Sequence, residues 1–357
     1  LSPNSDSGAT WTLPSDAEIT ELVIEALAPV DPVVALAPLE LRITATAIHP
    51  QDGRMYLAID NSLMTLDYSN DPIVIDIMEM DSDIRDLVID TSNNLLHILS
   101  GEDGFSAYSL DDTSEQSGLT APTFWPESSS QPSYDVFYLA SNGFVYAAYE
   151  NGIAQWDGLN WTFPMTKLTS GKALDIAEVN GVLYVSFDDE GVVRWDLNSG
   201  SALSTWSTAN SLHSDEIVEM MVSGNQILFA SPDSGLARYD WNSGFWLSTW
   251  TDGNWLASNS INGMARSGVD LFILSGDTLH IYDTTSGVFT SSQVISNFGL
   301  TGDGSDLIVW PAIGDRAPTS ELLLLGNGFG SFAELTPNPA LTQTGTLLIG
   351  SGPTSSS

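Results

Sequence analysis

Short runs of apolar and β-branched residues alternate with turns rich in Gly, Asn, Asp and Ser along most of this chain. The clearest instance is residues 211–252, where Ser-Gly-Asn, Pro-Asp-Ser-Gly and Asn-Ser-Gly separate four such runs. Turns of this composition between short strand-like runs favour an antiparallel meander. We therefore expect four short antiparallel strands in this stretch.

One strand type recurs from residue 41 onwards: an apolar residue, two variable residues, an aromatic residue or Leu, and then usually Asp. Successive copies lie 39 to 53 residues apart, and they end at Asp67, Ser109, Asp157, Asp196, Asp240, Asp283 and Thr336. A period of about 40–50 residues is typical of β-propeller blades. A parallel solenoid would show a shorter and stricter period.

A second, almost continuously apolar run precedes each copy, at residues 55–60, 95–100, 144–150, 182–188, 227–231, 271–275 and 321–326. Runs of this kind predict strands that are buried on both faces, here between neighbouring blades. The innermost strands are expected ahead of them, at residues 42–50, 84–90, 134–141, 173–180, 216–224, 262–269 and 306–313. Outer strands are expected to be the most irregular, as at residues 161–165 and 245–250.

These patterns predict an all-β protein, a β-propeller of seven four-stranded blades over residues 41–345. Residues 1–40 are expected to be an N-terminal extension with closing strands, and residues 346–357 a C-terminal strand and a Ser-rich linker. Eight blades result if residues 9–40 build one of their own. Pairing of residues 10–13 with residues 347–349 in one blade would close the ring and remove a free edge.

Residues 4–11, NSDSGATW, resemble the Asp-box of sialidase-like propellers, with Asp6, Gly8, Thr10 and Trp11 at matching positions. In that motif the Asp side chain accepts backbone N–H groups, Gly allows the chain to reverse, and Trp packs beneath the turn. The roles are structural, so the resemblance implies a propeller turn and by itself identifies no enzyme.

Residues 172–198 and 211–242 resemble the two-component-regulator propeller repeat, through LHSDEIVEM, ILFAS and GLARYD in one unit and LYVSF and GVVRWD in the other. This resemblance implies a propeller and an extracytoplasmic setting. It carries no active site, because the matching positions are fold residues. Structural roles are accordingly expected for Trp156, Trp195, Tyr239 and Tyr282.

Composition narrows the range of partners. The chain has 46 acidic and nine basic residues, a formal net charge of −37. Nucleic acid and anionic membrane surfaces are therefore disfavoured as partners, because few Lys or Arg side chains exist to neutralise phosphate. The chain has no Cys, which excludes disulfides, thiolate catalysis and zinc–thiolate sites. No apolar run approaches the ~18 residues that span a bilayer, and we expect a chain that opens with Leu1 to be a processed product or a fragment of a longer one.

Several acidic turns are candidates for binding a metal ion. Weak Ca²⁺ candidates are Asp81, Asp83, Asp188, Asp189, Asp303 and Asp306, because Ca²⁺ prefers carboxylate oxygens. None of these turns has the spacing of an EF-hand loop. Solvated loop carboxylates are the alternative, and no other cofactor is expected.

Catalytic groups do not converge in the sequence. The four histidines are isolated, the arginines are spread over the chain, and Arg194 and Arg238 share one repeat position, which favours a packing contact. Most of the tryptophans around residues 206–255 are expected to pack between blades, and an exposed platform for sugars or a protein is the alternative.

Three functions are compatible with this pattern. The first is a non-enzymatic extracellular or cell-surface propeller, a structural or protein-interaction module that self-assembles through its terminal strands. The second is a sensor ectodomain that binds carbohydrate or another ligand. The third is a glycoside-active enzyme, which would need convergent carboxylates in the central channel.

Overall fold

The computed structural model describes residues 43–348, apart from residues 69–73, 101–103, 112–133, 150–151, 158–159, 167–170, 189, 301, 303, 319, 328–330 and 338–340. The chain divides into two units, Leu1–Leu39 and Glu40–Ser357, and every described residue belongs to the second. The Asp-box-like turn and the predicted strand at residues 10–13 therefore lie outside the described residues.

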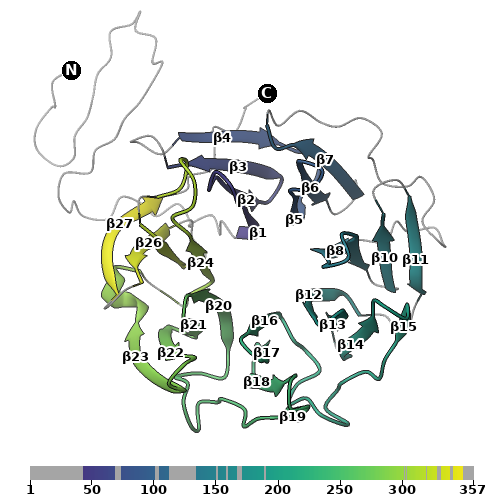
Figure 1. The fold of residues 1–357 in the computed structure, drawn as a ribbon. Helices are drawn as coiled ribbons and strands as arrows, with labels where there is room; N and C mark the ends of the chain where they lie inside the picture. The colour runs from purple at the N-terminus through teal and green to yellow at the C-terminus, as the bar shows by residue number, and fades with distance from the viewer. Residues whose placement is uncertain are drawn as a thin grey trace, which may run out of the picture. The chain divides into compact units, whose positions relative to one another are not determined.

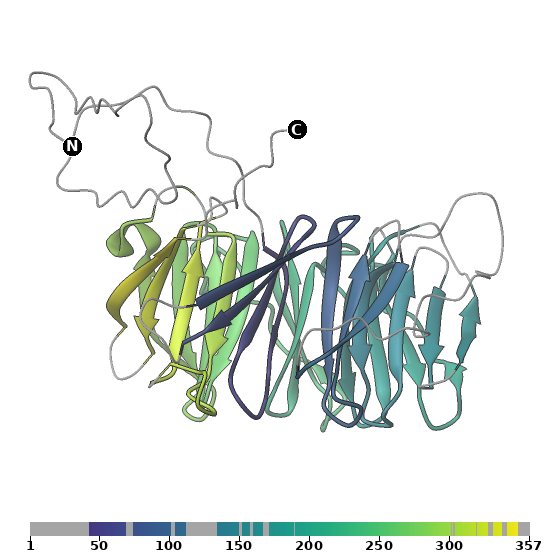
Figure 2. The same ribbon diagram turned by 90° about the horizontal axis from the view of Figure 1, so that it is seen from above.

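Seven antiparallel sheets form a ring, as expected for a seven-bladed β-propeller (Figure 1). The strands next to the ring axis are β1 (Ile43–Ile48), β5 (Ile84–Asp90), β8 (Tyr134–Leu139), β12 (Ala173–Val179), β16 (Glu219–Ser223), β20 (Ile261–Ser267) and β24 (Asp306–Trp310). Seen edge-on, the strands cross the thickness of the ring (Figure 2). The structure thus confirms the predicted fold class and blade count.

The second strand of each blade is the apolar one, as predicted. These strands are β2 (Met55–Ile59), β6 (Leu95–Ser100), β9 (Val145–Tyr149), β13 (Val182–Phe187), β17 (Gln226–Ser231), β21 (Asp270–Ser275) and β25 (Leu322–Gly326). Nearly every described side chain in them is buried, because each contacts a neighbouring blade on both faces.

The third strands carry the recurring sequence and end in a tight turn. They are β3 (Ser62–Asp67), β7 (Gly104–Ser109), β10 (Gly152–Trp156), β14 (Gly191–Asp196), β18 (Gly235–Asp240), β22 (Thr278–Asp283) and β26 (Ser331–Thr336). The terminal Asp explains the motif: Asp240 Oδ1 accepts the backbone N–H groups of Asn242 and Ser243 at 3.0 and 2.9 Å. This Asx turn starts the reversal toward the outer strand.

Outer strands vary most in length, as predicted. They are β4 (Val74–Glu79), β11 (Trp161–Thr166), β15 (Ser201–Ala202), β19 (Phe245–Trp246), β23 (Val288–Val294) and β27 (Thr342–Leu348). The sheet of blade 2 has three described strands, β5, β6 and β7. A short 3-10 helix, η1 (Ile295–Phe298), follows β23.

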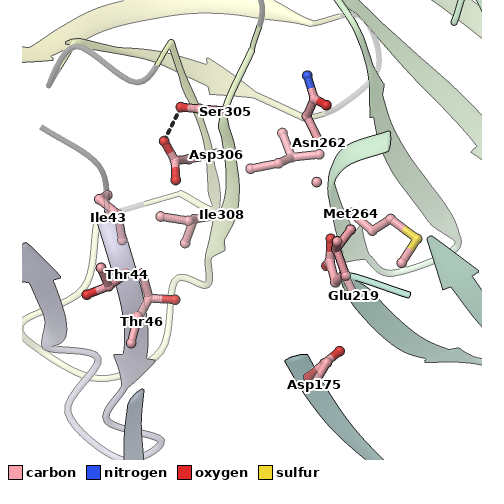
Figure 3. A pocket seen from close by; sticks show the side chains of 14 residues that line it. Ile43, Thr44, Thr46, Asp175, Glu219, Asn262, Met264, Ser305, Asp306 and Ile308 are labelled. Atoms are coloured by element: carbon pink, nitrogen blue, oxygen red, sulfur yellow. Dashed lines mark hydrogen bonds between the residues drawn. The ribbon is translucent and has the colours of Figure 1, made fainter. Parts of the chain in front are cut away.

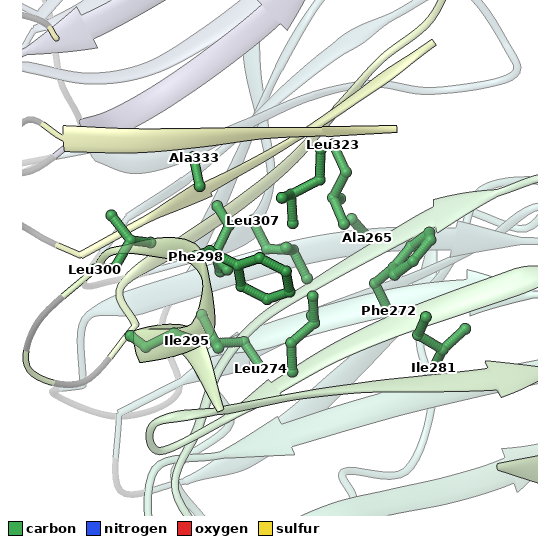
Figure 4. Packing of buried hydrophobic residues seen from close by; sticks show 13 residues of the cluster. Ala265, Phe272, Leu274, Ile281, Ile295, Phe298, Leu300, Leu307, Leu323 and Ala333 are labelled. Atoms are coloured by element: carbon green, nitrogen blue, oxygen red, sulfur yellow. The ribbon is translucent and has the colours of Figure 1, made fainter. Parts of the chain in front are cut away.

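The described core consists of seven apolar clusters, one at each boundary between neighbouring blades. Figure 4 shows the cluster between blades 6 and 7, where Ile295 and Phe298 of η1 pack against Leu274 and Leu307. No blade buries its apolar faces alone, so each one depends on both neighbours. The ring of packed blades, rather than any single blade, is therefore the stable unit.

Blade 7 closes the ring on blade 1 through side chains and a loop. The indole of Trp310 is fully buried in the cluster between these blades and donates a hydrogen bond to the Gly53 carbonyl oxygen at 2.7 Å. In the loop after β24, the Arg316 carbonyl oxygen accepts the Tyr68 N–H at 2.8 Å, and the Arg316 N–H donates to the Asp52 carbonyl oxygen at 2.9 Å. All four strands of blade 7 come from one contiguous segment. Strand exchange between the chain termini therefore stays a prediction for residues outside the described part.

Candidate functional site

A cavity of about 390 Å³ lies within the central channel and is lined by innermost strands of five blades, β1, β12, β16, β20 and β24. Figure 3 shows their side chains converging on this space. The polar lining residues are Thr44, Thr46, Asp175, Glu219, Asn262, Ser305 and Asp306. Each of these side chains has an oxygen that can accept a hydrogen bond, and the Thr and Ser hydroxyls and the Asn amide can also donate one.

A β-bulge near the start of several innermost strands fixes one recurring position. The register shifts between Ile84 and Asp86 in β5 and between Ala173 and Asp175 in β12. Such a bulge re-aims the side chains that follow it. In these two strands the residue after the shift, Asp86 or Asp175, pairs with the penultimate residue of the apolar strand. Glu219 pairs with the penultimate residue of β17 and Asp306 with the last residue of β25, both without a register shift, so an acid stands at or next to this position in four blades.

Two of these carboxylates bridge adjacent blades. Asp175 accepts the backbone N–H of Ile176 in its own strand at 2.7 Å and that of Met220 in the next blade. Glu219 is oriented in a similar way toward the backbone N–H of Met264 one blade further on, which opposes the rise of its pKa. The free edges of the innermost strands face the channel, and unpaired N–H groups there need acceptors. The acidic side chains thus accept hydrogen bonds from backbone N–H groups at the strand edges and still lie at the cavity wall.

Desolvation changes the acidity of this pair. Burial raises the pKa of Asp175 to about 7, against the opposing effect of its two backbone donors. Burial also raises the pKa of Glu219 to about 8, and repulsion from the Asp175 carboxylate adds to that effect. Near neutral pH the pair therefore holds protons that an exposed Asp or Glu would have lost. Such groups can both donate and accept hydrogen bonds.

Asn262 and Ser305 are committed to structural contacts. The Asn262 side-chain amide donates to the Gly304 carbonyl oxygen at 2.8 Å and its oxygen accepts the Ser260 hydroxyl at 2.8 Å. Ser305 donates its hydroxyl to Asp306. These bonds tie blade 6 to blade 7 beside the cavity. Asp175 and Glu219, together with the exposed Thr44, are the side chains best placed to meet a ligand.

The predicted calcium ligands do not gather at one place. Asp306 lines the channel cavity, Asp81 and Asp83 are exposed in the turn before β5, and Asp188 is half-buried after β13. Asp189 and Asp303 lie outside the described residues. Within the described part of the chain, no three His, Asp or Glu side chains form a group that could hold a metal ion. Calcium binding stays a prediction.

The arginine contacts predicted from the repeat are confirmed. The guanidinium groups of Arg194 and Arg238 lie over the rings of Trp206 and Trp250, at 4.2 and 4.1 Å from the ring centroids. Each also donates its Nε–H to a backbone carbonyl ten residues further on. These are cation–π packing contacts within a blade edge.

The predicted structural aromatic residues lie at blade boundaries. Trp156 and Trp195 are buried in the clusters on either side of blade 3. Tyr239 and Tyr282 pack against Trp206 and Trp250, with ring centroids 4.6 Å apart in both pairs. Asp6, Gly8 and Trp11 lie outside the described residues.

Sequence reasoning missed Asp175 and Glu219. A usable signal was present, because the predicted innermost strands carry an acid directly before an apolar residue in Asp86-Leu87, Asp175-Ile176, Glu219-Met220 and Asp306-Leu307. A charged residue recurring in a strand next to a propeller axis indicates a position that faces the channel.

Comparison with known proteins supports the fold. No protein-family model matches the sequence, and no curated protein matches it. Among solved structures, the crystal structure of the computationally designed Ika8 protein is similar, with a TM-score of 0.54 and 12% identity over 88% of this chain and 98% of that chain. As many as 1389 chains of solved structures match, so the fold by itself selects no ligand.

A second similar structure is the extracellular domain of the putative hybrid two component system BT3049 from B. thetaiotaomicron. Its TM-score is 0.58 at 14% identity, over 80% of this chain and 38% of that chain. This chain therefore spans well under half of that domain. In the described part of this chain, no helix is long and apolar enough to cross a membrane.

Proposed function

We propose that this chain is a non-enzymatic, extracellular binding propeller that takes a small hydrogen-bond-donating molecule in its central channel. The observation that carries the proposal is the convergence of Thr44, Thr46, Asp175, Glu219 and Asp306 on one cavity of about 390 Å³. Pockets of roughly 300–1,000 Å³ suit small molecules. Because these residues come from several blades, the affinity for a ligand would depend on how the blades are arranged around the channel.

The chemistry of the lining selects the class of ligand. Every polar side chain of the lining carries an acceptor oxygen, and the chain carries a formal net charge of −37. An anionic ligand would add unfavourable charge to this environment, whereas a polyol or an amine donates hydrogen bonds to the lining oxygens, and a polyol can also accept them from the hydroxyl and protonated carboxyl groups of the wall. We therefore favour a polyhydroxylated or amine-bearing molecule of about the size of a monosaccharide.

The extracellular setting is supported by two independent similarities. Residues 172–198 and 211–242 resemble the two-component-regulator propeller repeat, and the fold resembles the extracellular domain of a putative hybrid two component system. Both favour a sensing or interaction module outside the cytoplasm. Self-assembly through the terminal strands is a separate proposal, because those segments lie outside the described residues.

Two carboxyl groups with raised pKa values in a channel also meet part of the requirement for glycoside hydrolysis. That reaction needs one protonated and one ionised carboxyl group, set apart by different environments. Here burial raises the pKa of both Asp175 and Glu219, and each is oriented toward a backbone N–H of the next blade. This common environment favours binding over catalysis.

Isothermal titration calorimetry with D-glucose, myo-inositol, D-glucosamine and spermidine tests the proposal. At least one compound should bind, and Asp175→Asn and Glu219→Gln should each weaken it at least tenfold. Glu216→Gln is the matched control, since Glu216 is exposed three residues before Glu219 and does not line the cavity. Failure of all four compounds to bind, or binding unchanged in both variants, would overturn the proposal.

Buffers of different ionisation enthalpy separate the two ligand classes. At pH 7 a bound amine should displace protons from the Asp175 and Glu219 pair, because a nearby positive charge lowers the pKa of a carboxyl group. A polyol should leave those protons in place. Release of 4-nitrophenol from its glycosides, abolished by Glu219→Gln, would instead establish an enzyme.

A further inference from the structure

A second candidate site lies at the outer rim, on a residue that the fold does not require. Trp255 is 58% exposed, and its indole stacks on the ring of Phe289, with centroids 5.7 Å apart and planes at 15°. Phe289 belongs to β23, the outermost strand of blade 6, and packs on Trp250 with centroids 4.9 Å apart. Trp255 is therefore an exposed ring on a fixed aromatic support, well away from the strands that line the channel.

The repeat itself shows that the loop folds without this ring. Residues 205–212, TWSTANSL, correspond to residues 249–256, TWTDGNWL, so Ser211 occupies the position of Trp255. Both loops have the same hydrogen bonds. Asn210 accepts the Ser207 N–H at 3.0 Å and donates to the Thr205 carbonyl oxygen at 3.0 Å. Asn254 repeats these two bonds at 2.8 and 3.0 Å.

The packing beneath the two loops also corresponds. Leu212 and Leu256 are both buried, as are Trp206 and Trp250. Trp246 lies 5.0 Å from Trp206 between ring centroids, in the place that Phe289 takes beside Trp250. At these two blade boundaries the aromatic cluster is thus complete without a ring at the position of Trp255. Trp255 is an addition to one of two otherwise equivalent loops.

We propose that the exposed face of Trp255 binds a pyranose ring of a neutral glycan. The C–H face of a pyranose is apolar and close in size to an indole, so it packs on an exposed ring that has a polar surround. Exposed Asp252 and Gly253 occupy the same turn, and the Asp252 carboxylate can accept sugar hydroxyls. The acidity of the chain favours a neutral glycan over an anionic one.

The same features disfavour a protein partner at this position. A stable protein interface buries about 800 Å² on each side around an apolar centre. Within its own loop, the exposed positions around Trp255 are Asp252, Gly253, Asn254 and Ala257, with no large apolar side chain among them. An isolated ring of this kind suits one sugar residue better than a protein surface.

Calorimetric titration of the full chain with cellohexaose, laminarihexaose, maltohexaose and N-acetylchitohexaose tests the proposal. At least one oligosaccharide should bind, Trp255→Ser should weaken it at least tenfold, and Trp255→Phe should retain part of the affinity. Phe245→Ser is the matched control, because Phe245 is 71% exposed on the outer strand of blade 5 and should leave the affinity unchanged.

Two measurements separate loss of binding from loss of fold. The Tm of Trp255→Ser should stay close to that of the wild type, as the Ser211 loop shows that the turn tolerates Ser. The proposal is overturned if none of the four oligosaccharides binds, or if Trp255→Ser binds as well as the wild type. A dimer in sedimentation velocity that disappears in Trp255→Ser would also overturn it, in favour of a protein interface.

Discussion

The indole N–H of Trp310 donates a hydrogen bond to the carbonyl oxygen of Gly53 across 257 positions of sequence. This contact joins the last blade to the first in a ring whose described blades are each built from a contiguous segment. A propeller closed in this way depends on side-chain packing at the junction. The residues that pack there should therefore be disproportionately important for stability.

Replacement of Trp310 by Phe should lower the free energy of unfolding by about 2–4 kcal/mol. The substitution leaves the buried Gly53 carbonyl oxygen without its donor and opens a cavity beside it. Urea denaturation followed by circular dichroism measures the loss. Trp255→Phe, at an exposed position, is the control and should change stability by less than about 0.5 kcal/mol. Equal effects of the two substitutions would contradict closure through Trp310.

Stability should fall as the pH rises from 5 to 9, through Asp175 and Glu219. Burial raises the pKa of these carboxyl groups to about 7 and 8, so the folded state binds more protons than the unfolded state above pH 4.5. The contribution of these two groups to the free energy of unfolding is fully present at pH values below their unfolded pKa values. It is lost as the pH rises through their folded pKa values of about 7 and 8. Thermal unfolding across this range measures the effect.

Glu219→Gln should flatten that decline, since Gln cannot ionise in the channel. Glu216→Gln, an exposed position three residues earlier, controls for the change in net charge. A parallel decline in wild type and Glu219→Gln would show that Glu219 does not carry the penalty.

Asp90 should act in the opposite direction, at acid pH. The His97 imidazole, whose Nε2 lies 3.8 Å from the carboxylate, and two hydrogen bonds donated by Asn93 lower the pKa of this buried carboxyl group to about 2. Its stabilisation is present above pH 3.8 and is lost as the pH falls through 2, and it amounts to about 2 kcal/mol. Asp90→Asn should therefore be less stable than the wild type at pH 5, and the difference should shrink toward pH 2. A difference that does not change with pH would argue against a charged Asp90.

Gly235 should not tolerate a side chain. It has a φ of +84°, and a Cβ there would lie 2.2 Å from the carbonyl oxygen of Trp250 in the segment leading to the next blade. Gly268 also has a positive φ, +58°, but open space around it. Gly268→Ala should cost about 1 kcal/mol through backbone strain alone, and Gly235→Ala should cost at least about 3 kcal/mol. Similar unfolding free energies for the two variants would rule out a close approach at Gly235.

The fold follows from sequence because its signals are local and repeated. The run before Asp240, for example, specifies an apolar strand edge, an aromatic residue for the blade boundary and an Asx turn within a few residues. Seven similar runs make the ring the one arrangement that buries all of the apolar second strands. The short outer strands, such as β15 and β19, lack this redundancy, and their extents could not be predicted.

The channel site could not be predicted in the same way. Asp175 and Glu219 lie 44 positions apart in the sequence, and they line the same cavity only because each occupies the same register position in adjacent innermost strands. Their placement on one cavity depends on the bulge in β12 and on the curvature of the ring, which no local pattern encodes. Trp255 was among the tryptophans expected mostly to pack between blades, and its exposure became visible only in the loop geometry.

The central claim is that the channel is lined by desolvated carboxyl groups that bind the ligand. The most direct test is to measure the pKa values of these groups. Carbon-detected NMR of selectively labelled Asp and Glu carboxyl groups, assigned with Asp175→Asn and Glu219→Gln, reports each pKa with and without ligand. We predict pKa values for Asp175 and Glu219 far above those of exposed carboxyl groups, and a downward shift when an amine binds. Ordinary pKa values for both groups, unchanged by any ligand, would contradict the account.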